Sequence, residues 1–330
     1  MEELKLTFIN VGYGESAFLE CPDPAFEGGV FTMLIDGGSN EDAEYAAAAS
    51  GRIPAHMYLR RRGVGHLDLM VNTHIHEDHL CGLLPVAEQL PPGALWQILP
   101  EGFHRRMRPL DIPDGITPSQ SKFLHALNDY QSLCQKAEAG GCPIRQMSGG
   151  EEIRLCQGLH ARVLGPTKSG GELLATQLQA LYEEREEQAF WEKLNRLDAS
   201  MNNFSMVLLL EYQGTRILLP GDTNEMGYSG LIEANLQADL FKVGHHGQRD
   251  GVSEAQIQVI RPKAVVCCAS SDRRYNSAHP DIMGMLASHG AELYFSDCPE
   301  IPGQPVPPPH QALCFSIGAG GHLSPEYQSL

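Results

Sequence analysis

The sequence predicts a layered α/β fold in which two β-sheets carry helices on their outer sides. Short apolar segments that stop at glycine or aspartate fill both ends of the chain, which is typical of strands. The middle differs, because Ser119–Ala139 and Glu172–Leu197 have the character of helices, the second with apolar residues at helical spacing. We therefore expect one domain over residues 1–330, with helical insertions at about 100–150 and 170–200.

The expected strands follow from these apolar segments in order. In the first half, the first segment alternates with period two, and the third stops at Asp36-Gly37-Gly38; the four expected strands are Leu4–Phe8, Ser16–Glu20, Val30–Ile35 and Leu67–Val71. Strands resume after the helical middle, at Met206–Tyr212, Arg216–Leu219, Leu240–Val243, Ala264–Cys268, Glu292–Phe295 and Ala312–Ile317.

Composition excludes several classes of protein. Hydrophobic residues make up 42% of the 330 residues and charged residues 20%, which are values of a globular chain rather than a disordered or fibrous one. We expect no secretory signal and no membrane contact, since no apolar run approaches the ~18 residues of a membrane span. The nine cysteines, an odd number without CxxC spacing, suit reduced thiols in a cytoplasmic protein.

The strongest chemical signal is the segment Thr73-His74-Ile75-His76-Glu77-Asp78-His79, which directly follows the expected strand Leu67–Val71. A strand end followed by a helix start can direct the first two histidines to one side and the aspartate and third histidine to the other. Imidazole and carboxylate groups are ligands that Zn²⁺ and similar divalent ions accept. The cluster therefore predicts a metal site.

One cluster cannot complete two metal sites, so further ligands must come from distant parts of the chain. Three candidate positions end or follow apolar strands. Asp222 ends Leu218-Leu219-Pro220-Gly221-Asp222, and the other positions are His245 with His246, and His279. Considered singly, Asp222 could be a helix N-cap and His279 a loop histidine. Together they indicate ligands that gather at one edge of the fold.

These motifs resemble those of the metallo-β-lactamase fold superfamily. Within it, the chain is similar to the subgroup that contains the soluble hydrolase-like domain of the DNA-uptake competence protein ComEC. Beside the histidine cluster and Gly82, the matching segments are Val11-Gly12-Tyr13-Gly14-Glu15, Ile35-Asp36-Gly37-Gly38, Asn202–Val207, Leu218–Asp222, Asp239–Gly247 and His279-Pro280. The resemblance implies a four-layer αββα sandwich and hydrolase activity.

The resemblance also implies a site for two divalent metal ions, with zinc expected and manganese or iron as alternatives. By resemblance, one ion is held by His74 and His76, and the second by Asp78 and His79. Asp222 bridges the two ions, and His246 closes the site. The resemblance implies three catalytic residues: Asp78, which orients the attacking water, His245 beside the substrate, and His279 as a proton donor or a further ligand.

The chain departs from the subgroup in three places, and it shares with the subgroup the lack of one ligand histidine of the superfamily. Glu15 stands where aspartate is usual, Cys81 precedes Gly82, and Gln248 replaces a serine after His-His-Gly, which puts that serine's contact with substrate in doubt. No histidine between residues 80 and 200 matches the superfamily's third ligand motif, so water or Asn202 would have to fill that position.

The resemblance favours a phosphoester as substrate, hydrolysed in a phosphodiesterase or nuclease-like reaction. A formal net charge of −17, from 24 basic and 41 acidic residues, weighs against long nucleic acid. A small or flexible anionic substrate, including single-stranded nucleic acid, fits better because two bound cations would attract it locally. Two alternatives remain open: a hydrolase of a lactone, amide or thioester, and a catalytically idle metal-binding interaction module. The sequence does not predict an oligomeric state.

Overall fold

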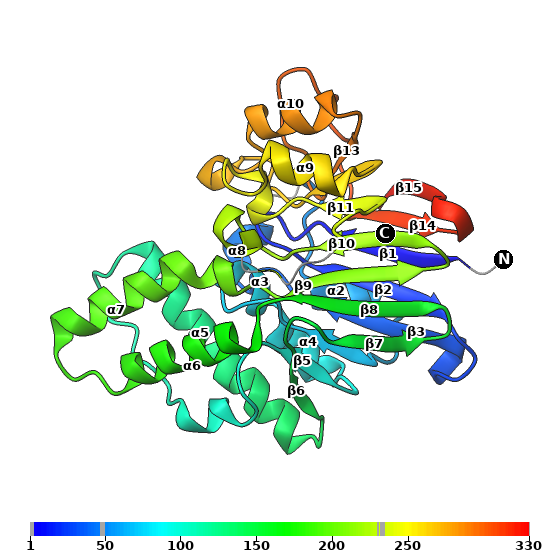
Figure 1. Ribbon diagram of the computed structural model, residues 1–330. Coiled ribbons are helices and arrows are strands. Elements are labelled where there is room, and N and C mark those ends of the chain that lie inside the picture. Colours follow the sequence, from blue (N-terminus) through cyan, green and yellow to red (C-terminus); the bar gives the residue numbers. More distant parts are fainter. Residues whose placement is uncertain (1–2, 47–49, 230, 232–234, 330) are drawn as a thin grey trace.

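A computed structural model describes residues 3–46, 50–229, 231 and 235–329 of the chain. Within these residues two β-sheets face each other (Figure 1). The first sheet has eight described strands, in the order β15 (Leu323–Gln328), β14 (Ala312–Ile317), β1 (Leu4–Ile9), β2 (Ala17–Pro22), β3 (Val30–Ile35), β4 (Leu69–Val71), β5 (Leu95–Gln97) and β6 (Ile144–Gln146). The second has seven, in the order β13 (Glu292–Phe295), β12 (Ala264–Cys267), β11 (Leu240–Lys242), β10 (Thr215–Leu219), β9 (Val207–Tyr212), β8 (Leu159–Gly165) and β7 (Glu152–Cys156).

Alternation along β9 shows how the layers are held together. Leu208 and Leu210 lie in the core shared by the two sheets, whereas Val207 and Leu209 lie in a second core on the other face. This second core contains apolar side chains of two helices, α9 (Glu254–Ile260) and α10 (Pro280–Ser288). Successive strand residues point to opposite faces, so one apolar strand serves both layers.

The other described α-helices are α1 (Asp42–Tyr45), α2 (Ala55–Arg61), α3 (Glu77–Leu80), α4 (Leu83–Gln89), α5 (Pro118–Ala139), α6 (Lys168–Tyr182), α7 (Glu187–Ser200) and α8 (Glu225–Ser229). Buried residues of α2 and α4, including Tyr58 and Val86, join the larger core with the first sheet. The layered α/β sandwich expected from the sequence is therefore confirmed. Among the described residues, no helix is long and apolar enough to cross a membrane.

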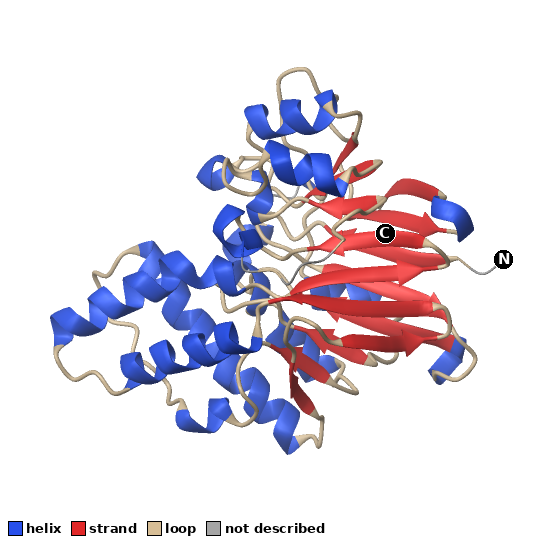
Figure 2. Ribbon diagram, in the orientation of Figure 1, coloured by secondary structure: helices blue, strands red, loops and turns tan. Residues whose placement is uncertain are grey.

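Helices α5, α6 and α7 gather at one end of the two sheets, beyond the strand ends (Figure 2). Helix α5 begins with a capping box, in which Thr117 and Gln120 each accept a hydrogen bond from the other's backbone N–H. The single helix expected over Glu172–Leu197 is wrong, because α6 ends at Tyr182 and α7 starts at Glu187. The carboxylate of Glu186 accepts from two backbone N–H groups and caps the start of α7.

Candidate metal centre

The histidine cluster occupies the connection between β4 and α3, and close backbone packing fixes its shape. The loop after β3 lies against it, with Gly37 N donating to His79 O at 2.7 Å and Gly82 N to Gly38 O at 2.8 Å. A Cβ atom on Gly82 would stand 1.9 Å from Gly37 O, so only glycine fits there. This contact explains why the two glycine-containing motifs occur together.

A cavity of about 290 Å³ opens beside the cluster. Its lining comes from both sheets' connections and from the helices at the sheet end: Tyr13, His76, Glu77, Asp78, Ser119, Lys122, Phe123, Asp198, Asn202, Asp222, His245, Gln248 and Tyr275. Segments far apart in the sequence thus meet at one place, as the sequence predicts for its candidate ligands.

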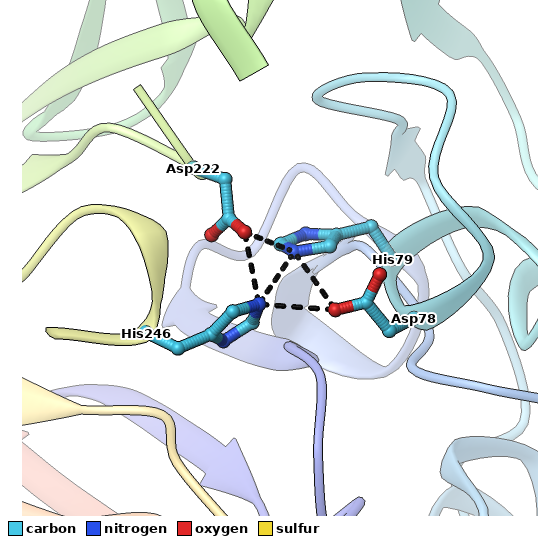
Figure 3. Close-up of side chains that lie close together, drawn as sticks. All are labelled: Asp78, His79, Asp222 and His246. Atoms are coloured by element: carbon cyan, nitrogen blue, oxygen red, sulfur yellow. Dashed lines mark hydrogen bonds and ion pairs between the residues drawn. The ribbon is translucent and has the colours of Figure 1, made fainter. Parts of the chain in front are cut away.

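Four of the candidate ligands point toward one another (Figure 3). Asp78, His79, Asp222 and His246 each offer a ligand atom, and these atoms lie within 4.8 Å of one another. The Nε2 atom of His246 lies 2.9 Å from Asp222 Oδ2 and 3.0 Å from Asp78 Oδ2, and His79 Nε2 lies 3.2 Å from Asp222 Oδ2. Two imidazoles and two carboxylates at this spacing fit a divalent ion.

His74 and His76 form a second pair of converging nitrogens. His74 Nε2 lies 3.2 Å from His76 Nδ1, and the ring centroids of His74 and His79 are 4.3 Å apart. His74 is buried and His76 lines the cavity. The two candidate ligand sets are therefore neighbours, as a dinuclear site requires.

Each of these four imidazoles has its other nitrogen held by an acceptor behind it. The pairs are His74 Nδ1 with Thr73 Oγ1 at 3.0 Å, His76 Nε2 with Asp198 Oδ1 at 3.3 Å, His79 Nδ1 with Asp36 Oδ2 at 2.8 Å, and His246 Nδ1 with Cys268 O at 2.7 Å. An acceptor behind one nitrogen places the proton there and leaves the lone pair of the other free for a metal.

Asp36 organises two of these contacts from a fully buried position. Its carboxylate accepts from the backbone N–H of Thr73 at 2.9 Å and from the Thr73 hydroxyl at 2.5 Å, in addition to His79. Asp36, His74 and His79 also group as a possible metal-binding set. Because the Asp36 oxygens already hold Thr73 and His79, this carboxylate orients the histidines rather than facing the cavity.

The charges of the site favour a cation. Burial alone would lower the pKa of His79 and His246, but Asp222 and Asp78 raise it, for His246 to about 9. Burial would conversely raise the pKa of the two carboxyl groups, and the neighbouring imidazoles hold it below its usual range. The same carboxylate field that attracts protons onto these rings would attract a metal ion.

Lys242 supports Asp222 from the interior of the second sheet. Its ammonium group is fully buried, donates to Gly221 O at 2.7 Å and Asp222 Oδ1 at 3.1 Å, and pairs with the carboxylate of Glu15. Burial disfavours the charged amine, but Glu15 and Asp222 together raise the pKa of Lys242. The glutamate found in place of the subgroup's aspartate therefore reaches this lysine.

Asn202 is the residue that the resemblance offers as a substitute for the missing third ligand histidine. It belongs to the 3-10 helix η4 (Met201–Phe204), which ends α7, and it lines the cavity. Its Oδ1 atom is buried and has no hydrogen-bond partner among the described residues. The next residues anchor the segment to the site, because Ser205 Oγ accepts from Asp222 N at 3.2 Å and Met206 N donates to Thr73 O at 2.8 Å. An unsatisfied buried oxygen beside candidate ligands fits a metal ion.

The two remaining candidate histidines lie in different surroundings. His245 lines the cavity, and its Nδ1 lies 2.8 Å from Asp250 Oδ1. His279 caps α10, where its Nδ1 lies 3.2 Å from Asp281 N and its Nε2 lies 3.0 Å from Arg249 Nε. His279 is not among the described residues that line the cavity, so its role as ligand or proton donor stays a prediction.

Sequence reasoning missed several residues of the site. Tyr13 and Tyr275 line the cavity, Asp198 holds His76, and Asp250 holds His245. Tyr13 and Lys242 lie inside matched motifs, and a lysine in the buried strand β11 was a usable signal. Asp198 and Tyr275 carried no comparable signal, because a contact between residues far apart in the sequence leaves no pattern around a helix or loop residue.

Comparisons in sequence find a matching family and a curated relative. The sequence profile described as "Metallo-beta-lactamase superfamily" matches residues 26–106. The chain is also 24% identical over 304 residues to ComE operon protein 3 of Bacillus subtilis (strain 168), an alignment covering 89% of this chain and 32% of that protein. The chain thus spans about a third of the length of this curated relative.

Similar solved structures include Zn(2+)-bound PqqB from Methylobacterium extorquens, with 12% identity, a TM-score of 0.41 and coverage of 88% of this chain and 97% of that chain. Another is CmlA, a diiron beta-hydroxylase from Streptomyces venezuelae, with 12% identity, a TM-score of 0.43 and coverage of 89% and 52%. The motifs, the fold and the matches in sequence together support a metallo-beta-lactamase superfamily protein that is similar to ComEC.

Proposed function

We propose that the protein is a dinuclear metal-dependent phosphodiesterase that acts on a small or flexible anionic phosphoester. The observation that carries this proposal is the orientation of four imidazoles. Each has one nitrogen fixed by an acceptor. The other nitrogens of His79 and His246 face the carboxylates of Asp78 and Asp222, and those of His74 and His76 face each other. Similarity to the metallo-beta-lactamase superfamily supports a hydrolase, and the His-His-Gly resemblance supports chemistry at phosphorus.

The ligand roles follow from this arrangement. His74, His76 and Asn202 Oδ1 would hold one ion, whereas Asp78, His79 and His246 would hold the other. Asp222 lies against the second set, with Oδ1 fixed by Lys242 and Oδ2 directed at His79 and His246. When bound, two divalent ions supply hydroxide at neutral pH and stabilise negative charge at a phosphoryl group. The nitrogen and oxygen ligands suit zinc, with manganese and iron as alternatives.

The chain's own residues then position and protonate the substrate. Asp78 has its carboxylate at the cavity and orients the attacking water. His245 faces the same cavity, and its hydrogen bond to Asp250 holds the pKa of that carboxyl below its usual range. A histidine paired with a carboxylate can deliver a proton to the leaving oxygen. We therefore assign proton donation to His245, assisted by Asp250.

The substrate class follows from charge. The formal net charge of −17 gives no broad electrostatic footprint for duplex nucleic acid, whereas bound cations would attract an anion into the cavity. Short single-stranded nucleic acid and small organophosphates both meet this condition. Free thiols at all nine cysteines accord with a cytoplasmic setting.

Metal analysis and an ester panel test the proposal together. Protein purified without added metal is analysed by mass spectrometry, alongside H74A and D222N. We expect metal in the wild type and a fall below about half of that content in the variants, by loss of ligands. Hydrolysis of bis-p-nitrophenyl phosphate supports the proposal. Activity on lactones alone points to a carbonyl hydrolase, and bound metal without turnover points to an idle binding module.

A further inference from the structure

Two tyrosines face each other at the mouth of the cavity, on the side of His246. The ring centroids of Tyr13 and Tyr275 are 5.1 Å apart, with their planes at 62°. Tyr13 is buried and packs on the His246 imidazole at 4.6 Å, whereas Tyr275 is 58% exposed. An aromatic column therefore runs from a candidate metal ligand out to solvent.

One carboxylate, that of Glu44, contacts both Tyr13 and the residue that precedes Tyr275. Glu44 Oε1 accepts from the backbone N–H of Tyr13 at 2.9 Å, and it also accepts from Arg274 Nη2 at 3.2 Å, next to Tyr275. Arg274 Nε in turn donates to Asp272 Oδ2 at 2.8 Å. Charged hydrogen bonds of this kind are strong and directional, so the exposed ring stands on a fixed base.

The loop that carries Tyr275 adopts an unfavourable backbone. Arg273, Tyr275, Asn276 and Ala278 have φ values of 50°, 53°, 60° and 44°, a region that residues other than glycine rarely occupy. Ala278 N donates to His246 O at 2.9 Å, which ties the loop to the His-His-Gly turn. Strained conformations persist where function uses them, and this one presents a large ring to solvent above the candidate metal centre.

We infer that Tyr275, supported by Tyr13, is a stacking platform for a flat ring of the substrate. This ring belongs to the part of the substrate that keeps the phosphate after the leaving group departs. This inference rests on the proposed function and narrows its substrate class to phosphodiesters that carry a nucleobase or an aryl group. Aromatic side chains stack on any such ring, and the stacking of a nucleobase on a protein aromatic ring does not depend on which base it is. The platform binds the ring while the metal centre holds the phosphate.

Two esters with the same leaving group isolate the platform. They are the p-nitrophenyl phosphate ester of thymidine and methyl p-nitrophenyl phosphate, which lacks a ring on the retained side. We expect Y275A to lower the ratio of kcat/KM for the thymidine ester to that for the methyl ester by roughly tenfold, mainly through KM. Y275F keeps the ring and should keep the ratio. V306A, at an exposed valine outside the cavity lining, is the matched control.

Phenyl p-nitrophenyl phosphate identifies the ring. A loss shared with the thymidine ester shows a platform for any flat ring, and a loss for thymidine alone shows a platform for nucleobases. An unchanged ratio in Y275A overturns the inference. Calorimetric titration of metal-loaded protein with thymidine monophosphate measures binding to the platform without turnover. Equal affinity in wild type and Y275A also overturns the inference. A wild type that binds thymidine monophosphate but cleaves neither ester contradicts the proposed function instead.

Discussion

The ammonium group of Lys242 lies 3.1 Å from Asp222 Oδ1, and both side chains are buried. This contact fixes one oxygen of the carboxylate and leaves Oδ2 directed at His79 and His246. The lysine also compensates the charge of Glu15, which is buried. A single cation thus orients the central carboxylate of the site and neutralises a second one.

Replacing this lysine should destabilise the fold strongly. In K242M, the carboxylates of Glu15 and Asp222 stay buried without their cation, so the free energy of unfolding should fall by about 3–5 kcal/mol. Urea denaturation of wild type and variant measures the difference. The control is K263M, because Lys263 is 62% exposed and pairs with Asp239 at the surface; it should change stability by about 1 kcal/mol or less. Equal effects of the two changes on the free energy of unfolding would show that the buried lysine contributes no more to stability than the exposed one.

The helix α7 should contribute to metal binding through Asp198. This carboxylate accepts from His76 Nε2 and also from the hydroxyl of Ser119 on α5. In D198N the imidazole loses its anionic acceptor, and affinity for one metal should fall about 10–100-fold. Competition with a chromophoric chelator measures it. E192Q, an exposed change on the same helix, should leave the affinity at the wild-type value.

Adjacent asparagines give a matched test of the missing ligand. N202A removes the unpartnered oxygen at the cavity, so the affinity of one of two metal equivalents should fall by roughly tenfold or more. N203A removes a neighbouring amide that lines a different cavity and should leave both equivalents unchanged. N202H should restore binding, since imidazole is a stronger ligand. Metal titration followed by calorimetry distinguishes these outcomes, and equal behaviour of N202A and N203A would exclude Asn202 as a ligand.

The metal-free protein should lose stability as the pH rises above neutral. The folded pKa of His246 is raised to about 9, against an ordinary value of 6.5. A group whose folded pKa is raised stabilises the folded state fully below the unfolded pKa, and this contribution disappears as the pH rises through the folded pKa. The free energy of unfolding of chelator-treated protein should therefore fall between about pH 6.5 and 9.

Denaturation of chelator-treated H246Q over the same pH range is the control for this prediction. Its slope should be shallower, because glutamine does not titrate, while His79 retains a raised pKa and continues to contribute. Identical slopes in wild type and H246Q would show that His246 is not the titrating group.

The sequence predicted the parts of the site whose residues directly follow a strand along the chain. The histidine cluster, Asp222 and His246 were found because each follows an apolar strand directly, and the connections of neighbouring strands meet at one end of the fold. Asp198 could not be predicted, because nothing in the sequence of α7 distinguishes an acidic residue that accepts a hydrogen bond from His76 from one that faces solvent. Tyr275 could not be predicted, because the neighbouring Arg274 is held by Glu44, which is 230 residues away in the sequence.

Asp198 stands between the sandwich and the helices beyond it, since one oxygen meets His76 and the other meets Ser119. If His76 holds a metal ion, docking of α5 and α7 and binding of that ion should be linked equilibria, in which each step strengthens the other by the same free energy. Amide hydrogens of α7 should exchange more slowly once metal is added. The availability of metal would thereby determine how well ordered the helices beside the cavity are.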